Sequence, residues 1–512
     1  MSPLDLYRYP DNCSNRDCRR SGVQISPHYP TIYPSHGLQI SDVERDLHEA
    51  LRATRAIKNT FIPINKLPPE ILSSILEHRD SEQDLVTSTH VCRHWRSNLT
   101  SHPSLWTCFL FTGQTYDVDR TLTYLERSKS APLDVMMQLN SSPDLEVFRR
   151  IAPHIARTRS LVIQGMDRPE IDAACLLLRT PSPTLVYLEV RAHRGLVHLP
   201  DDFLGQQAPS LHSVTFGGIH PSFESYLPLP SLIDFNLSLP EGADPFHVGG
   251  LFRFLSNCPQ LKKVHIESKA ISQDIPPDGI ISLESLAELD YTCDPVGRIL
   301  PYLRLPRLGR LRVTFPFRSG QVQKLSDLLP HGGHTLLSGT TEISHYSYES
   351  SQEVQFRGMG TDVSFAMSRP PADHNSVDWF PTEKCIPFGQ IESLTVGLSV
   401  PVDFPINFAV FENLKIIRIV PWNVQSTEVF LRLLHPNTGA EAPCPSLQEI
   451  RFHCWGPLGL VIDLAKERKR AGHQLALVWV LTDTWYGPDP NLVEELKEHV
   501  GEVLVKRWDG EI

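Results

Sequence analysis

The sequence predicts an α+β protein in which a small N-terminal three-helix domain is followed by an α/β solenoid. Two observations predict this fold class. Three short apolar patterns at helical spacing lie within residues 61–111, and a leucine-containing phrase then returns many times before about residue 455. A length of 512 residues also exceeds what one compact core usually holds, so we expect several domains.

Composition limits the class of protein. Hydrophobic residues make up 41% and charged residues 21%, as in ordinary soluble globular proteins. The formal net charge of −11 argues against a general nucleic-acid binder. The first residues lack the apolar core of a secretory signal, and no apolar run approaches a membrane span. The ten cysteines are scattered and form no CxxC pair. We expect a cytoplasmic and/or nuclear protein with reduced thiols that binds neither nucleic acid nor membrane.

The N-terminal region divides into two segments. Residues 1–38 mix Pro, Tyr, Ser and Asn without periodicity and are predicted to be a disordered arm. Residues 39–60 are predicted to form an amphipathic helix that packs against the following domain. Its apolar positions are Val43, Leu47, Leu51 and Ile57. A short coiled-coil seam is the alternative for this helix.

Residues 61–111 carry the three short helical patterns. The Pro68-Pro69 pair suits a first helical turn, and Glu70 complements the helix dipole there. A capping box at residues 81–84 opens the second helix. Apolar side chains recur at helical spacing in the first and third helices: Ile71, Leu72, Ile75 and Leu76, then Val91, Trp95 and Leu99. A core this small is marginal on its own, and its remaining apolar surface suggests a partner.

The runs at residues 67–72, 91–96 and 103–106 together resemble an F-box. Their residues are especially similar to those of F-box proteins of mushroom-forming (basidiomycete) fungi. An ordinary three-helix segment of a larger helical domain is the alternative. The resemblance implies binding to a Skp-type adaptor and, through it, to a cullin. By motif, adaptor contacts would fall on Leu67, Pro68, Ile71, Leu72, Ile75, Val91, Trp95, Leu105 and Trp106. Some of these must form the helical core, and the sequence does not divide them.

From residue 112 onward one phrase recurs: a small residue or proline, then L-x-x-L-x-Φ, where Φ is apolar. Its copies begin at Pro183, Pro209, Pro230, Pro259, Glu284, Pro306, Gly389, Glu412 and Pro445, with a weaker one near Leu161. Neighbouring copies lie roughly 21–33 residues apart, except for a larger gap after residue 315, which resembles leucine-rich repeats. The Asn or Cys of regular repeats is mostly missing, so we expect irregular units. An α/β domain of another kind is the alternative.

These patterns set the remaining domain boundaries. We predict the first part of the solenoid over residues 112–315, an insertion with hairpin-like strands over 316–388, and the last repeats over 389–455. Residues 456–512 are predicted to form a capping α/β segment of two helices and two strands. The first of these helices carries the basic run 466–470, which reads as a solvated helix face in preference to a nuclear-import signal.

Residues between the apolar positions of each strand should share the opposite, concave face. This stripe changes from acidic to basic along the repeats and suits a charged peptide or protein epitope. A solvated sheet face is the alternative reading. The candidate substrate-binding residues are Tyr187, Lys263, His265, Glu288, Asp290, Arg310, Arg312, Arg418 and Arg451.

No motif predicts catalysis, a metal or a cofactor. The chain lacks a GxSxG nucleophile elbow, a phosphate-binding GxxxxGK[ST] loop and a complete dinucleotide fingerprint. His90, Cys92 and His94 would point in divergent directions on a helix, and Cys13 with Cys18 lacks a second ligand pair. A hydrolase therefore ranks last among the candidate functions.

The F-box resemblance implies a non-catalytic substrate-recognition subunit of an SCF-type cullin–RING ubiquitin ligase, acting in ubiquitin-dependent protein degradation. The F-box would bind the adaptor and the repeats would bind an unknown protein substrate. The alternative is a non-catalytic leucine-rich-repeat scaffold, or an adaptor-binding protein, with no ubiquitin-ligase role.

Overall fold

The computed structural model separates the chain into two compact units, Met1–Thr100 and Ser101–Ile512, here called unit 1 and unit 2. It describes residues 34–78, 82–111, 118–223, 229–240, 242–244, 247–268, 279–293, 299–316, 329–347, 351–368, 386–398, 408–421, 424–435, 442–453, 457–482 and 487–507. Most of the predicted disordered arm, residues 1–38, lies outside this set. The structure confirms an α+β chain with a helical N-terminal region and a large, mostly parallel sheet.

Unit 1 is helical. It contains α1 (Pro34–Thr60), the 3-10 turn η1 (Pro63–Lys66), α2 (Pro69–Glu77), α3 (Glu82–Thr89) and α4 (Arg93–Ser101). Helix α2 begins at Pro69, where the missing N–H of proline has no intrahelical partner to lose. The small core of unit 1 contains Leu72, Leu85 and Leu99, each at most 1% exposed. The predicted capping residue Ser81 lies outside the described residues.

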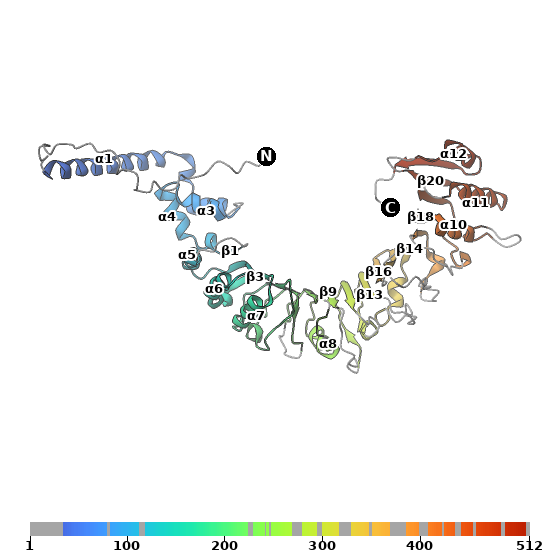
Figure 1. Ribbon diagram of the computed structural model, residues 1–512, viewed down its shortest axis with the longest axis horizontal. Coiled ribbons are helices and arrows are strands. Elements are labelled where there is room, and N and C mark those ends of the chain that lie inside the picture. Colours follow the sequence, from blue (N-terminus) through green and yellow to red (C-terminus); the bar gives the residue numbers. More distant parts are fainter. Residues whose placement is uncertain are drawn as a thin grey trace, which may run out of the picture. The chain divides into compact units, whose positions relative to one another are not determined.

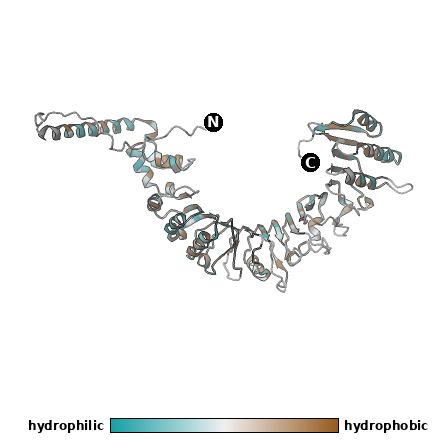
Figure 2. Cartoon of the chain, in the orientation of Figure 1, coloured by the Kyte–Doolittle hydropathy of each residue, from teal (hydrophilic) through white to brown (hydrophobic). Residues whose placement is uncertain are grey.

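Helix α1 holds its apolar side chains in solvent. In Figure 2, hydrophilic and hydrophobic residues alternate along the turns of this helix. Val43, Leu47, Leu51 and Ile57 are exposed, which differs from the prediction that they pack against the following domain. The reason is geometric, because α1 comes close to η1 just after its C-terminal end and the helix otherwise extends away.

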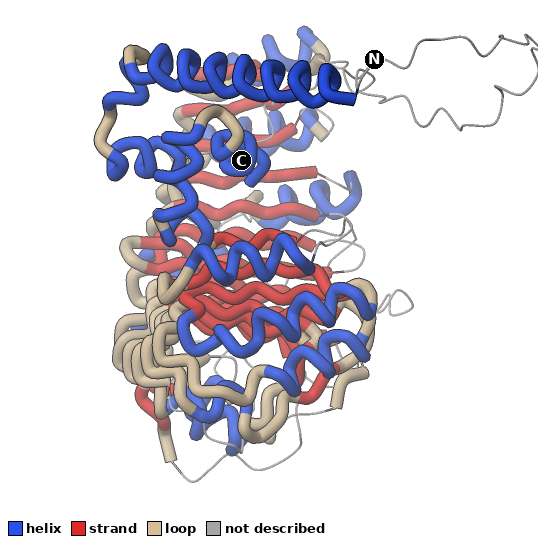
Figure 3. The backbone as a smooth tube through the Cα atoms, turned by 90° about the vertical axis from the view of Figure 1, so that its left-hand side faces the viewer, coloured by secondary structure: helices blue, strands red, loops and turns tan. Residues whose placement is uncertain are grey.

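The described residues of unit 2 are built on one seventeen-stranded sheet. Every described neighbour pair is parallel except the two pairs made by β15. Figure 3 shows the strands as a ladder of roughly aligned segments. In spatial order they are β1 (Cys108–Phe111), β2 (Leu133–Leu139), β3 (Thr158–Gly165), β4 (Tyr187–Ala192), β6 (Ser213–Gly217), β8 (Asp234–Ser238), β9 (Lys263–Ser268), β11 (Glu288–Cys293), β13 (Arg310–Pro316), β16 (Thr361–Ser368), β15 (Ser351–Gly358), β14 (Thr340–Ser347), β17 (Ser393–Leu398), β18 (Ile416–Pro421), β19 (Glu449–His453), β20 (Leu477–Thr482) and β21 (Glu502–Arg507).

Helices cover the outer side of this sheet and leave its inner side to strands alone (Figure 1). The covering helices are α5 (Val118–Ser128), α6 (Ser142–Ile151), α7 (Arg168–Leu177), α8 (Val248–Ser256), α10 (Val424–Leu433), α11 (Leu458–Arg470) and α12 (Pro490–Lys497). Shorter elements connect them: α9 (His334–Leu337), the paired strands β5 (Val197–His198) and β7 (Ile219–His220), and the paired strands β10 (Ile281–Ser282) and β12 (Leu303–Arg304).

Each copy of the recurring phrase forms the same local structure. The strand begins at the fifth residue of the phrase in all nine copies, as at Ser213 after Pro209. The leucine or isoleucine at the third position is buried in every copy, as Leu211 is. In the copy at Pro209, the Leu211 N–H donates to the carbonyl of Ala208, forming a tight turn before the strand. The phrase therefore encodes one turn, one core side chain and one parallel strand.

The predicted insertion continues the sheet. Strands β14, β15 and β16 form an antiparallel meander, and its outer strands pair in parallel with β17 and β13. Neighbouring strands of the meander run in opposite directions, so only an odd number of strands lets both outer strands run parallel to the rest of the sheet. Three is the smallest such number above one. Residues 317–328 and 369–385 of the insertion lie outside the described residues.

The C-terminal segment contains the two helices and two strands that the sequence indicates, in the order α11, β20, α12 and β21. One side chain differs from its predicted environment. Arg468, within the supposedly solvated basic face of α11, is fully buried, and its guanidinium donates to the carbonyls of Pro443 and Cys444 at 2.8 and 2.9 Å. Those carbonyls belong to the turn before β19, so Arg468 fixes that turn against α11.

Candidate binding surfaces

Helix α2 presents apolar side chains to solvent. Ile71 and Ile75 lie one helical turn apart and are each 49% exposed. Pro68 directly precedes the helix and is also exposed. Val91, in the turn between α3 and α4, is 60% exposed. These four residues, here called the helical apolar surface, form the part of the predicted adaptor-contact set that a partner can reach.

The other predicted adaptor-contact residues are partly or fully buried. Leu67 and Trp95 are partly buried, and the indole Nε1 of Trp95 donates to Oδ1 of Asn65 at 2.6 Å. Leu72 is buried inside unit 1, at the core between the helices. Burial of this side chain fits a structural role, which the sequence could not distinguish from adaptor contact.

Leu105 and Trp106 belong to the core of unit 2. They lie in the turn η2 (Pro103–Trp106), and both are at most 1% exposed. The Trp106 ring packs edge-on against Tyr124 of α5 at 4.9 Å between centroids. The Arg127 guanidinium lies 4.3 Å from the Trp106 ring centre. These contacts join the end of the predicted F-box pattern to the first covering helix of the sheet.

The inner face of the sheet brings the predicted substrate-binding residues into two continuous rows. Strand register alone produces them, because each residue pairs with its counterpart on the next strand. The first row contains Tyr187, Ser213, Asp234, Lys263, Glu288, Arg310, Asp362, Arg357, Glu342, Ser393, Ile416 and Glu449. The second contains Glu189, Thr215, Asn236, His265, Asp290, Arg312, Ser364, Gln355, Ser344, Thr395, Arg418, Arg451 and Trp479.

Ion pairs cross from strand to strand in the middle of these rows. Lys263 Nζ lies 3.1 Å from Oε1 of Glu288, and Arg310 Nε lies 3.0 Å from Oδ2 of Asp362. His265 Nδ1 lies 3.2 Å from Oδ2 of Asp290. The hydrogen bond to Asp290 raises the pKa of His265 above its usual value, although burial opposes this shift. Arg312, in the same row, is exposed.

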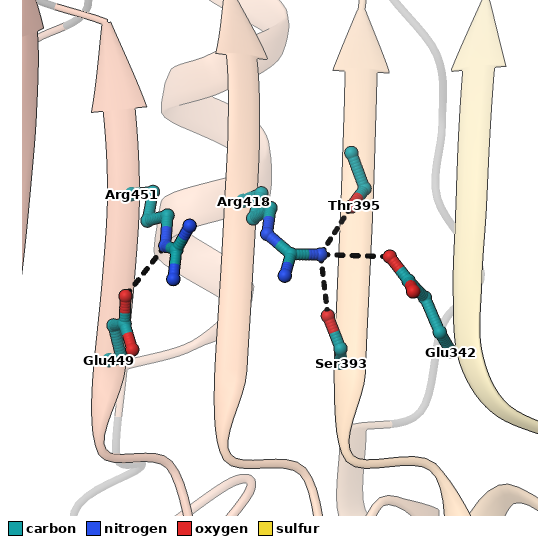
Figure 4. A network of polar contacts seen from close by, with 6 residues as sticks. All are labelled: Glu342, Ser393, Thr395, Arg418, Glu449 and Arg451. Carbon is teal, nitrogen blue, oxygen red and sulfur yellow. Dashed lines mark hydrogen bonds and ion pairs between the residues drawn. The ribbon is translucent and has the colours of Figure 1, made fainter. Parts of the chain in front are cut away.

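Arg418 is the centre of a polar network near the C-terminal end of the sheet (Figure 4). Its Nη1 donates to Glu342 Oε1 at 2.8 Å and to Ser393 Oγ at 2.9 Å. Glu342 comes from β14 and Arg418 from β18, so the contact spans the intervening strand β17. Arg451 on β19 bonds instead to Glu449 of its own strand at 2.6 Å.

Two further clusters lie at the two ends of the rows. At the N-terminal end, Glu189 accepts from Tyr187, Arg191 and Gln164. Burial raises the pKa of Tyr187 to about 12, with the hydrogen bond to Glu189 adding to the shift. Burial would raise the pKa of Glu189, but the three hydrogen bonds outweigh it and lower that pKa. At the C-terminal end, Arg451 and Lys506 lie 5.2 and 5.6 Å from the Trp479 ring centre.

Sequence reasoning missed several members of this face. Glu342 and Asp362 come from the insertion, and Trp479 and Lys506 come from the C-terminal segment, where no copy of the recurring phrase marks the strands. The alternation of apolar and polar residues within 343–367 was the available signal. It identifies strands, but it does not say that they join the sheet or in which register.

The described residues offer little for other chemistry. No group of three or more His, Cys, Asp or Glu side chains among them is arranged to hold a metal ion. Within the same residues, no helix combines the length and hydrophobicity needed to cross a membrane. Burial raises the pKa of the Cys175, Cys258 and Cys444 thiols to about 12, which keeps them protonated near neutral pH.

Comparison with known proteins identifies one region. A family model described as F-box-like matches residues 64–112. No curated protein matches the chain. The match covers α2, α3 and α4 together with η2 and β1. An F-box-like domain implies binding of a Skp-type adaptor, and this domain contains the helical apolar surface.

Proposed function

We propose that this chain is the non-catalytic substrate-recognition subunit of an SCF-type cullin–RING ubiquitin ligase, acting in the cytoplasm and/or the nucleus. The F-box-like match at residues 64–112 carries the proposal. The exposure of Ile71 and Ile75 within that match supports it, because a partner must cover apolar side chains that the small helical core does not use. Such a receptor raises the local concentration of its substrate near the ubiquitin-loaded enzyme and needs no catalytic residues.

Adaptor capture tests the first half of the proposal. Replacing Ile75 by Asp places a charge in the apolar contact and should reduce recovery of a Skp-type adaptor at least tenfold in a pull-down. The double variant Leu67→Ala with Pro68→Ala should also lose the adaptor while the sheet unit stays folded. Ser74→Asp is the matched control, since Ser74 is exposed on the same helix one position away. Wild-type recovery of adaptor by the Ile75 variant would refute the assignment.

Cullin recovery separates a ligase receptor from a scaffold that binds only the adaptor. In the proposed function, a cullin co-purifies with the adaptor and is lost together with it in the Ile75→Asp variant. Adaptor without cullin under the same conditions would favour the non-ligase scaffold instead.

The substrate-binding half of the proposal concerns unit 2. We propose that its repeated turn-and-strand units form an irregular leucine-rich-repeat-like solenoid whose inner face binds a protein substrate. The two rows of charged and polar residues support this, because they alternate along each strand with the buried apolar residues and change character along the sheet.

Proximity labelling tests this second half. Proteins labelled by the wild-type chain should include a set that persists when adaptor binding is removed and disappears with Arg312→Glu on the inner face. Arg307→Glu is the matched control, because Arg307 is exposed in the turn before β13 and lies outside both rows. Identical labelling by both arginine variants would exclude the inner face as the substrate site.

A further inference from the structure

Strand β21 ends the sheet and leaves one of its own edges open. Among the described strands it pairs with β20 alone. The Glu502 N–H donates to the Ala476 carbonyl, on the β20 side. Because the backbone N–H and C=O groups of successive residues point to alternate sides of a strand, those of Val503 and Val505 point away from β20. Unpaired groups of this kind are a ready template for one more strand.

The apolar core of the sheet is also open at β21. Val478 and Val480 of β20 are fully buried. Their register partners on β21 are Val503, which is only partly buried, and Val505, which is 50% exposed. The terminal unit of a repeat array normally turns a polar surface outward, so these exposed apolar side chains indicate a surface that another strand covers.

Two opposite charges lie on the inner face of β21. Glu502, Leu504 and Lys506 alternate with the two valines, and Leu504 follows Trp479 in the second row of the inner face. The Lys506 Nζ lies 5.6 Å from the Trp479 ring centre, which places Lys506 on this face too. Glu502 and Lys506 are both exposed. An acidic side chain therefore precedes Leu504 on this face, and a basic one follows it at the same spacing.

We infer that β21 pairs antiparallel with β21 of a second copy of this chain, about a two-fold axis that passes Leu504. In this register Glu502 of each copy lies opposite Lys506 of the other, and the two Leu504 side chains lie opposite each other. Val503 lies opposite Val505 of the second copy, and these residues exchange both of their backbone hydrogen bonds. The axis is perpendicular to the sheet at β21, so the inner face of one copy continues into that of the other.

Other pairings of this edge lack the match of charges. Sliding the register to the next hydrogen-bonded position in either direction places Leu504 opposite Glu502 or opposite Lys506. Strand β1, at the opposite end of the sheet, contains no charged residue, so pairing β21 with β1 of another copy leaves Glu502 and Lys506 without partners. That head-to-tail pairing would also continue from copy to copy, whereas the two-fold pair closes on itself.

Solution mass tests the pairing. The full chain should elute in light-scattering chromatography at twice the single-chain mass of 57.8 kDa. Val505→Pro removes an N–H that points away from β20, so it should return the protein to the single-chain mass while the far-ultraviolet circular dichroism spectrum stays that of the wild type. Val505→Thr is the matched control, because it keeps this N–H and nearly the same shape, and it should stay dimeric. A wild-type chain that stays monomeric at all concentrations tested, a folded proline variant that stays dimeric, or a mass that grows beyond two copies would overturn the inference.

Charge inversion tests the register through exposed side chains and does not depend on the proline variant. Glu502→Lys places a lysine opposite Lys506 at both ends of the pair and should weaken the dimer about tenfold. Adding Lys506→Glu in the same chain makes the opposed charges complementary again and should restore the dimer. Glu498→Lys is the matched control, because it makes the same change of charge at an exposed residue outside β21. A dimer that is indifferent to Glu502→Lys, or that the double variant does not restore, would overturn the inference.

Self-pairing through β21 and adaptor binding can fail separately. The monomeric Val505→Pro chain should recover as much adaptor as the wild type, because Ile71 and Ile75 are unchanged. A chain that dimerises through β21 and recovers no adaptor would keep the inference and refute the proposed function.

Discussion

The charged side chains of the inner face are paired with one another more than the sequence suggests. Lys263, His265 and Arg310 each lie beside a carboxylate on a neighbouring strand. Exposed ion pairs of this kind contribute about 0–1 kcal/mol each to the free energy of unfolding. Their main effect is to hold the side chains in fixed positions across the sheet, so a charged ligand meets an ordered surface.

His265 gives a direct test of one such pair. Its pKa is raised first by the hydrogen bond to Asp290. Because the folded pKa lies above the unfolded one, this pair stabilises the fold below the unfolded pKa and loses its effect as pH rises through the folded pKa. The gain should be about 0.5 kcal/mol, since both side chains are about one-third exposed.

Titration of the histidine ring by nuclear magnetic resonance should therefore show a lower pKa for His265 in Asp290→Asn. The neighbouring Glu288→Gln substitution removes the partner of Lys263 and should leave the His265 pKa close to its wild-type value. An unchanged pKa in the Asp290 variant would mean that the 3.2 Å contact does not persist in solution.

Arg468 shows how environment alone decides a residue's role. In the sequence it stands in a run of charged residues, which is typical of a solvated helix face. In the fold it is fully buried beneath the turn before β19, and burial lowers its pKa. The guanidinium bonds the two adjacent carbonyls through two different nitrogens, a forked geometry that the single ammonium nitrogen of lysine does not reproduce.

Among the described strands, the meander β14–β16 is the one departure from a regular parallel sheet. It keeps the two rows continuous, since Asp362, Arg357 and Glu342 occupy the first row between Arg310 and Ser393. The sheet therefore does not break into two blocks at the gap in the recurring phrase. The contact between Glu342 and Arg418 connects this meander to the last repeats.

A double-mutant cycle on Glu342 and Arg418 measures that connection. Both side chains are largely shielded from water, being 30% and 19% exposed, so their coupling free energy should be about 1 kcal/mol. Chemical denaturation of the Glu342→Ala, Arg418→Ala and double variants gives this value. Arg451 with Glu449 is the matched comparison, because the hydrogen bond between these two side chains lies within one strand. Additive effects at Glu342 and Arg418 would contradict the role assigned to the network.

At the scale of the whole molecule, the two compact units should unfold separately. Unit 1 has a small helical core around Leu72, whereas the core of unit 2 runs the length of the sheet and includes Leu211. Leu72→Ala should cost unit 1 about 2–5 kcal/mol and lower only the unfolding temperature of that unit. Leu211→Ala should cost a similar amount and lower only the transition of the sheet.

Differential scanning calorimetry resolves the two transitions, and the variant that shifts each one assigns it to its unit. A single transition that shifts equally in both variants would show that the units unfold as one. Leu76→Ala is a milder control for the helical unit, since Leu76 is only partly buried.

The sequence by itself determined the local structure of this protein. The double proline at Pro68 fixes the start of α2, and each copy of the recurring phrase fixes a turn, a buried leucine and a strand, because these depend on neighbours in the chain. Only the tertiary structure decided which side chains meet. It buried Leu72, Leu105 and Arg468, left α1 uncovered, and brought Glu342 to Arg418 across an intervening strand. Such contacts depend on register and on the space left by packed neighbours, and neither is encoded in any short stretch of sequence.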